Sequence, residues 1–383
     1  MMIYLDNSAT TPLSPAVKES MTNAMEVFGN PSSLHALGLA AEKIVTASRD
    51  AIFSALNIRN KAAYQLYFTS SGSEANNQVL FGAAKAKNFR FTPRIITTDS
   101  EHPSVLEPLS VLKNSGVEVV KLSTKGGKIS LDEVREAVNE RTILISIMAV
   151  NNETGAIYDL KSVFALAKRL NPQIITHTDC VQGFMKIPFS PESVMADAVS
   201  LSAHKIHGPK GVGALLLAKS LITAKRITPL IYGGGQEGGM RSGTENVIGI
   251  AGFGAAAKES AAKLSEFREN ALALREAFLA ALPQEVKVNT PETFAPHIIS
   301  ITLPRLRSET LLHRLSAEGI FVSSGSACAS NKKGSNYVLP AFGLSADDAD
   351  STLRISLAHN TTQNDLLFTA ERIAAAMNEL IKR

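Results

Sequence analysis

The first residue whose surroundings could do chemistry is Lys205. It stands in the run SAHKIHGP, residues 202–209, directly after the apolar segment 197–201. This position is the carboxyl end of an expected strand, where open α/β sheets bind their ligands. A lysine that is desolvated there loses its proton readily and can form a Schiff base with a carbonyl compound. The run therefore predicts a cofactor-binding lysine, with a solvated loop lysine as the ordinary alternative.

A second apolar segment ends in polar groups at Asp179. Residues 174–182 are IITHTDCVQ, which places the carboxylate at the end of another expected strand. A carboxylate there can pair with a pyridinium nitrogen and make the ring a better electron sink. Gln182 could donate a hydrogen bond to a phenolic oxygen of the same ring. An aspartate that merely starts the next turn explains this segment equally well.

A turn of small residues, TSSGSEANN at 69–77, follows a strand and precedes a helical stretch. Backbone N–H groups and the helix dipole at such an N-terminus bind phosphate without a cationic side chain. Gly72 and Ser73 are the expected phosphate contacts. The alternative is an ordinary serine N-cap.

His102 follows a further expected strand, in the sequence EHPS of residues 101–104. An imidazole there could stack on a flat cofactor ring and move protons near neutral pH. A lone histidine has many structural roles, so this motif indicates a site only together with the others.

The chain has only two cysteines, so a disulfide framework is not expected. Cys328 lies in the run SSGSACASNKKGS, residues 323–335, whose small and polar residues predict a loop. Lys332 and Lys333 would favour the thiolate form of Cys328, which is the nucleophilic form. Cys180 follows an apolar strand, and we expect it to be a packing residue.

The segments that would position these residues alternate along the chain from about residue 60 onward. Short apolar runs alternate with longer amphipathic stretches, which is typical of a largely parallel sheet covered by helices. The expected strands are 64–69, 94–98, 117–122, 142–150, 173–178, 198–202 and 213–218, and the expected helices include 74–86, 103–114, 132–139 and 160–170. We therefore expect an α/β fold whose mostly parallel sheet of seven strands carries helices on both faces.

A length of 383 residues exceeds the size at which one hydrophobic core stops growing, so a second domain is expected. Near Val247 the pattern changes to an Ala-, Glu- and Lys-rich stretch through Leu282, which predicts one or two long helices. Apolar segments follow at 297–303 and 319–323. We expect a large cofactor-binding domain at residues 15–255, and a smaller α+β domain made of residues 1–14 and 256–383 that carries the cysteine loop.

Composition excludes several classes of protein. Hydrophobic residues make up 45% of the chain and charged residues 19%, which is typical of a globular protein. The net charge of +4 is spread without a basic block, so no nucleic-acid partner is expected. The N-terminus has no basic region followed by an apolar stretch, and no apolar run approaches the roughly 20 residues that span a bilayer. We expect a cytoplasmic protein without a membrane partner.

Two further patterns invite other functions. Residues 233–238, GGGQEG, fit the dinucleotide-binding pattern G-x-G-x-x-G, but no clean amphipathic helix follows them. His204 and His207 are spaced like metal ligands, but neither a helix nor a third ligand is evident. We therefore expect neither a nucleotide site nor a metal site.

Taken together, the motifs resemble the cysteine desulfurases, which belong to the fold-type I, class V aminotransferase-like group of pyridoxal-phosphate enzymes. The resemblance covers essentially the whole chain, and the motifs occur in the family's order. They are IYLDNSATTP at 3–12, GNPSS at 29–33, EH at 101–102, NNETG at 151–155, HK at 204–205, RSGTEN at 241–246 and SSGSAC at 323–328.

The resemblance implies roles for individual residues. Lys205 would bind pyridoxal 5'-phosphate covalently, Asp179 would pair with its pyridinium nitrogen and His102 would stack on its ring. The remaining contacts would come from Gln182 and Asn152 at the phenolic oxygen, and from Gly72, Ser73, Ser202 and His204 at the phosphate. Thr244 would reach the phosphate from the other subunit of a homodimer. Arg354, assisted by Asn30, would clamp the carboxylate of the substrate L-cysteine.

The same resemblance makes Lys205, Cys328 and His102 the catalytic residues. Cys328 would take sulfur from L-cysteine as a persulfide, leave L-alanine, and pass the sulfur to an acceptor such as an iron–sulfur scaffold protein. A selenocysteine lyase, or another class V lyase or aminotransferase, would share the scaffold and the early chemistry. Because transamination needs no loop cysteine, Cys328 argues against an aminotransferase. A sulfur-transfer partner with vestigial catalysis is the remaining alternative, and the intact lysine, aspartate and arginine set argues against it.

Overall fold

The computed structural model describes residues 2–87, 89–324 and 336–381. Within these residues the main sheet has seven strands, in the order β2-β8-β7-β6-β5-β3-β4. Their bounds are β2 Tyr64–Thr69, β3 Arg94–Thr98, β4 Glu118–Leu122, β5 Thr142–Ser146, β6 Ile175–Asp179, β7 Ala198–Ser202 and β8 Gly213–Ala218. The pairings from β7 to β4 are parallel, and β8 runs antiparallel to both β2 and β7. This confirms the expected α/β fold with a mostly parallel sheet.

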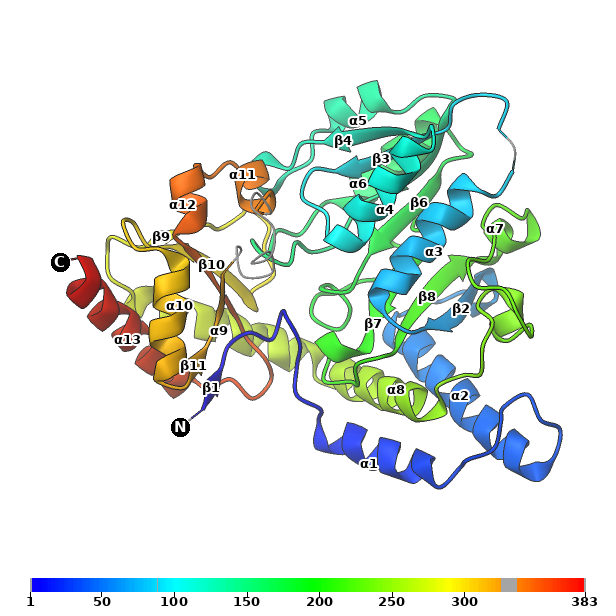
Figure 1. The fold of residues 1–383 in the computed structure, drawn as a ribbon, viewed down its shortest axis with the longest axis horizontal. Helices are drawn as coiled ribbons and strands as arrows, with labels where there is room; N and C mark the ends of the chain where they lie inside the picture. The colour runs from blue at the N-terminus through cyan, green and yellow to red at the C-terminus, as the bar shows by residue number, and fades with distance from the viewer. Residues whose placement is uncertain (1, 88, 325–335, 382–383) are drawn as a thin grey trace.

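Helices cover both faces of this sheet (Figure 1). They are α1 Pro15–Met25, α2 Ala36–Ala55, α3 Gly72–Ala84, α4 Pro103–Asn114, α5 Leu131–Ala137, α6 Leu160–Leu170, α7 Lys219–Thr223 and α8 Val247–Ala262. Along β2, Leu66 and Phe68 join the core packed against α2, α6 and α8, whereas Tyr67 joins the core packed against α3 and α4. This alternation is the two-residue period of a strand with two buried faces.

A smaller α+β part lies to one side of the main sheet (Figure 1). Its antiparallel sheet has the order β12-β13-β10-β9, and β1 pairs with β11 in parallel. The strands are β1 Ile3–Tyr4, β9 Lys287–Val288, β10 Ile298–Thr302, β11 Ile320–Phe321, β12 Ser323–Ser324 and β13 Thr352–Ser356; the helices are α9 Leu264–Ala281, α10 Ser308–Ala317, α11 Val338–Phe342, α12 Ala346–Asp350 and α13 Gln363–Ile381.

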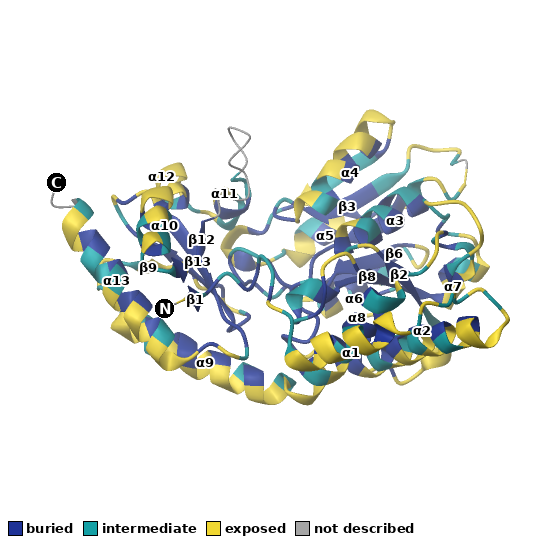
Figure 2. Cartoon of the chain, turned by 60° about the horizontal axis from the view of Figure 1, so that its bottom comes forward, coloured by how far each residue is buried: buried dark blue, intermediate teal, exposed yellow. Residues whose placement is uncertain are grey.

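The smaller part has a core of its own. Ile3 and Leu5 pack with side chains of α9, α10, β10, β13 and α13, while Figure 2 shows exposed residues on the outer faces of α9 and α13. The Ala-rich stretch forms two helices, α8 and α9, rather than one. The separate core supports a second domain. Helix α8 extends across residue 255, where we expected the boundary between the domains, so the position of that boundary stays a prediction.

The topology determines where a site can form. The carboxyl ends of β6 and β7 and the N-termini of α3 and α4 meet at one edge of the main sheet, where parallel α/β sheets bind ligands. The N-terminal segment crosses this edge, because Thr11 N–H donates to His204 O at 3.0 Å and Asp6 bridges to Ser356 of β13. Among the described residues, no helix is both long and apolar enough to cross a bilayer.

Candidate active site

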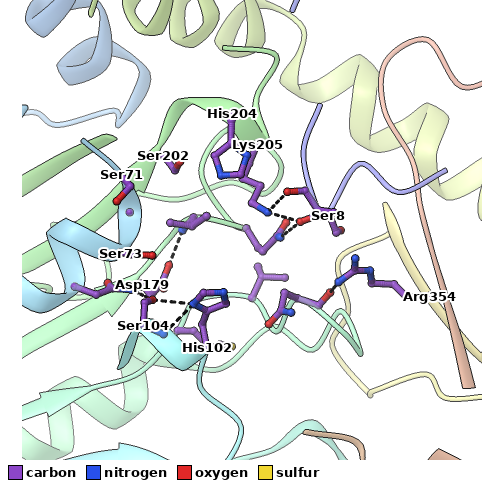
Figure 3. A pocket seen from close by; sticks show the side chains of 18 residues that line it. Ser8, Ser71, Ser73, His102, Ser104, Asp179, Ser202, His204, Lys205 and Arg354 are labelled. Carbon is purple, nitrogen blue, oxygen red and sulfur yellow. Dashed lines mark hydrogen bonds between the residues drawn. The ribbon is translucent and has the colours of Figure 1, made fainter. Parts of the chain in front are cut away.

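A cavity of about 290 Å³ lies at this edge of the sheet (Figure 3). It brings together ten of the residues expected from the sequence: Gly72, Ser73, His102, Asn152, Asp179, Gln182, Ser202, His204, Lys205 and Arg354. They come from segments spread over most of the chain, and the fold alone makes them neighbours.

Lys205 ends a short 3-10 turn, Ala203–Lys205, that follows β7 without a gap. Its Nζ donates to the backbone oxygens of Ser8 and Ala9, at 2.5 and 2.7 Å. The amino group therefore faces the cavity at the point where the N-terminal segment crosses it. Two carbonyl oxygens hold the amino group there, within reach of a carbonyl compound bound in the cavity.

Asp179, at the end of β6, is held by two donors on opposite sides of its carboxylate. Val181 N–H donates to Oδ1 at 2.9 Å, and Asn76 Nδ2 donates to Oδ2 at 2.7 Å. Only 6% of Asp179 is exposed. The carboxylate is thus fixed in a buried position that still borders the cavity, as a partner for a ring nitrogen must be.

Asn76 also influences which ring nitrogen of His102 carries the proton. Its Nδ2 donates a second hydrogen bond to Ser104 Oγ at 2.8 Å, so the hydroxyl hydrogen is available to His102 Nδ1, 2.8 Å away. The Ser104 backbone N–H donates to the same Nδ1 at 3.1 Å. Nδ1 is therefore the acceptor, and the neutral ring carries its proton on Nε2. The imidazole faces the cavity, and desolvation by the surrounding walls, opposed by Asp179, lowers the pKa of His102.

The N-terminus of α3 forms the phosphate-sized end of the cavity. Ser71 caps the helix by accepting from Glu74 N–H at 3.1 Å. A Cβ on Gly72 would lie 2.7 Å from Val181 Cγ2, so only glycine allows the helix to approach this closely. The neighbouring Ser202 Oγ is buried and has no hydrogen-bond partner among the described residues. An unused hydroxyl beside a helix N-terminus fits a phosphate group.

His204 borders the same end of the cavity. Its Nδ1 lies 3.2 Å from Thr10 Oγ1. Burial and the nearby charge of Lys205 lower the pKa of His204 to about 4. Near neutral pH the ring is therefore uncharged and offers one N–H donor.

Arg354 lies in the middle of β13, at the other end of the cavity. Its Nη2 pairs with Asp6 Oδ1 at 2.7 Å and its Nη1 donates to Asn152 O at 3.0 Å. Its Nε is buried without a partner within the described chain. A nearly buried guanidinium held in this way suits the recognition of a carboxylate.

Three expected site residues lie elsewhere. Asn30 and Thr244 are exposed, and neither lines the cavity as the described single chain forms it. Cys328 lies outside the described residues, as do Lys332 and Lys333. Cys180 is fully buried, which confirms it as a packing residue.

Sequence reasoning missed Asn76 and Ser104, although both stood in the motifs it selected. Asn76 shares the buried face of α3 with Ala75 and Val79, and a polar side chain within an apolar stripe was the signal that could have found it. Ser104 offered no such signal, because its role depends on the distance between the starts of α3 and α4. The N-terminal segment was also undervalued, since Ser8 and Ala9 line the cavity.

The other two patterns have structural explanations. Residues 237–239 of the glycine-rich run form a short 3-10 turn, not the start of a long helix. His207 Nδ1 lies 3.0 Å from Pro12 O. No group of three or more potential metal-ligating side chains occurs in the described part of the chain.

The fold and cavity are those of a class V aminotransferase-type enzyme, and comparison with known proteins agrees. The family model "Aminotransferase class-V" matches residues 3–367. The chain therefore belongs to this family, and membership implies a pyridoxal-phosphate-dependent enzyme.

Relatives within the family are more specific. The cysteine desulfurase IscS of Methanosarcina thermophila is 36% identical over 386 aligned positions, which cover 100% of this chain and 92% of the relative. The solved structure of a NifS-like protein has a TM-score of 0.92 at 35% identity and covers 99% of this chain and 100% of its own. The structure of SspA in complex with cysteine has a TM-score of 0.78 at 31% identity and covers 93% and 99%, respectively. The resemblance to cysteine desulfurases is thus confirmed.

Proposed function

We propose that this protein is a pyridoxal-phosphate-dependent cysteine desulfurase that converts L-cysteine to L-alanine and transfers the sulfur to Cys328 as a persulfide. The observation that carries the proposal is the convergence of Lys205, Asp179 and Arg354 on one cavity. They are a carbonyl-reactive amine, a partner for a ring nitrogen and a carboxylate clamp.

The cavity fits pyridoxal 5'-phosphate at each of its functional groups. Ser202 Oγ and the N-terminus of α3, with Gly72 and Ser73, would hold the phosphate, and His204 would donate to it. Asp179 would pair with the ring nitrogen, and Gln182 and Asn152 would contact the phenolic oxygen. When bound, the cofactor withdraws electrons from the substrate Cα and so makes the Cα proton acidic.

The chain's own groups then move the protons. Lys205 Nζ would take the proton from the substrate Cα, and His102 would assist proton transfer as an acid–base group. The lowered pKa of His102 favours the neutral ring, whose Nε2 carries a proton and is a donor toward the cavity.

Arg354 would orient L-cysteine through its carboxylate, with Asn30 as an assistant. The Cys328 thiolate would attack the substrate sulfur, so that an S–S bond forms as the substrate Cβ–S bond breaks. The bonding electrons remain on the carbon skeleton, which is protonated to L-alanine. L-Cysteine and the thiol thus become L-alanine and a persulfide without an added oxidant or reductant.

A homodimer would complete the site. Thr244 is exposed, and so are the large apolar side chains of Phe28, Leu34 and Tyr232, at 80%, 91% and 76%. Apolar groups this exposed favour burial against another chain, and a second copy would bring Thr244 to the phosphate of the first. The persulfide would pass to an acceptor such as an iron–sulfur scaffold protein, and a cytoplasmic location remains the sequence-based prediction.

The test is sulfide and alanine release from L-cysteine, with pyridoxal phosphate and a reductant, by the wild type and two cysteine variants. The Cys328→Ala variant should keep its cofactor colour and lose sulfide release, whereas Cys180→Ala, at the buried cysteine, should release sulfide like the wild type. If the wild type binds the cofactor but leaves L-cysteine unchanged, the function is wrong, and selenocysteine and transamination are tested next. A fully active Cys328→Ala variant would contradict the persulfide step alone.

A further inference from the structure

Lys186 is a buried lysine to which the proposed reaction gives no role. Only 5% of it is exposed. It follows β6 in the turn of residues 181–187, four positions after Gln182. A buried ammonium is costly, so its contacts should explain its presence.

Its hydrogen bond leads to the cavity. Lys186 Nζ donates to Gln182 Oε1 at 3.3 Å, and Gln182 Nε2 donates to Ser8 O at 2.8 Å. Ser8 O also accepts from Lys205 Nζ at 2.5 Å. Lys186 is thus linked to the cofactor lysine through one side-chain amide and one carbonyl oxygen.

The two ends of a glutamine amide have nearly the same shape and opposite hydrogen-bonding character. Burial and the charges of Lys205 and Arg354 lower the pKa of Lys186 to about 7, so below that pH the group is an ammonium. An ammonium only donates, so the end of the Gln182 amide that faces it must then be the oxygen. The other end, the NH2 group, then faces Ser8 O and the cavity and keeps a second N–H for an acceptor there. The flipped amide would place Nε2 against the ammonium and Oε1 against the Ser8 carbonyl, with both contacts repulsive.

We propose, on the basis of the function proposed above, that Lys186 is a positioning residue that keeps the Gln182 amide with its NH2 group directed toward the cofactor's phenolic oxygen. Lys186 itself does not touch the cofactor cavity. Its effect on cofactor binding therefore passes through Gln182.

The experiment measures the dissociation constant of pyridoxal phosphate from the full-length protein by absorbance titration, together with the visible absorption maximum of the bound form. Four proteins are compared: wild type, Lys186→Met, Gln182→Leu and the double variant. Methionine fills the space of the lysine stem, and an apolar replacement of a buried charge is commonly tolerated, which thermal unfolding of each apoprotein checks.

Lys186→Met should weaken binding about tenfold, as expected for a disturbed hydrogen bond to a charged oxygen, and should shift the absorption maximum. In the Gln182→Leu background it should change binding less than about twofold, because no amide is left to orient. A matched control is Lys263→Met, which removes an exposed lysine whose charge, like that of Lys186, lowers the pKa of His207. It should bind like the wild type.

Equal weakening by Lys186→Met in both backgrounds would mean that Lys186 acts by charge or packing and not through Gln182, and would overturn the inference. Unchanged binding and colour in the single variant would overturn it as well. A wild type that does not bind pyridoxal phosphate would instead refute the proposed function, so the two failures are distinguishable.

Discussion

Asp6 Oδ1 lies 2.7 Å from Arg354 Nη2 and joins the N-terminal segment to the middle of β13. The Arg354 side chain is only 6% exposed, and a second contact, from Nη1 to Asn152 O, helps to fix the plane of the guanidinium. The expected carboxylate clamp is therefore oriented before substrate arrives, and such preorganisation reduces the cost of binding.

Asp6→Ala should raise the KM for L-cysteine about tenfold and change kcat little, because it removes an orienting contact from the residue proposed to bind the substrate carboxylate. Asp6→Asn keeps an acceptor for Nη2 and should raise KM by less than about threefold. Steady-state kinetics of the two variants decide the matter. A lower KM for Asp6→Ala would show that Asp6 competes with the substrate instead.

Asn76 connects the two groups expected at the cofactor ring, since its Nδ2 donates to Asp179 Oδ2 and to Ser104 Oγ, the neighbour of His102. Asn76→Ala should change the visible spectrum of the bound cofactor and lower kcat by about ten- to a hundredfold, as for loss of hydrogen bonds to charged groups. Asn77→Ala, at the next position on α3, is the matched control and should leave both unchanged, because Asn77 donates only to the backbone oxygens of Ser73 and Ser104 and not to Asp179 or the Ser104 hydroxyl. Equal effects of the two variants would assign the loss to the stability of α3.

The contrast between Lys205 and Asn76 shows how far sequence reasoning reached. Strand ends such as Asp179 and the lysine turn after β7 were predictable, because the apolar period locates a strand and parallel strands bring their ends together. Ser104 and Lys186 were not, because the role of each depends on the relative placement of two segments. Asn76 could have been found as a polar residue within the apolar stripe of α3, but its partners could not. The role of Thr244 depends on the surface of a partner chain, and the roles of Thr244 and Asn30 both stay predictions.

Glu101 should make the stability of the protein depend on pH. Its carboxyl is completely buried and accepts from Met148 N–H and Thr98 Oγ1, and this burial raises the pKa of Glu101 to about 8. A raised folded-state pKa contributes stability that is present below the unfolded value, near 4.5, and is lost as pH rises toward 8. The glutamine of Glu101→Gln cannot ionise. As the pH rises from 4.5 toward 8, the free energy of unfolding of the wild type should therefore fall by a few kcal/mol relative to that of the variant, at ~1.4 kcal/mol for each pKa unit. Urea unfolding at pH 5 and at pH 8 gives the free energy of unfolding of both proteins. An equal change in the two proteins between these pH values would show that Glu101 does not titrate in this range.

Thr244 allows a test of the shared site with mixed dimers. Two variants are combined, Lys205→Ala with an intact Thr244 and Thr244→Val with an intact Lys205. If Thr244 serves the partner's cofactor, the mixed dimer has one doubly damaged site and one wild-type site. Neither homodimer should have a wild-type site: the Lys205→Ala homodimer forms no covalent link to the cofactor, and the Thr244→Val homodimer binds about tenfold more weakly, as for a lost hydrogen bond to a charged group. In the mixed dimer, up to half of the sites should bind pyridoxal phosphate with wild-type affinity. If Thr244 serves its own chain, no wild-type site can form in any mixture. Titration of the purified mixed dimer with pyridoxal phosphate distinguishes the two cases, because sites of wild-type affinity appear only if Thr244 reaches the cofactor of the partner chain.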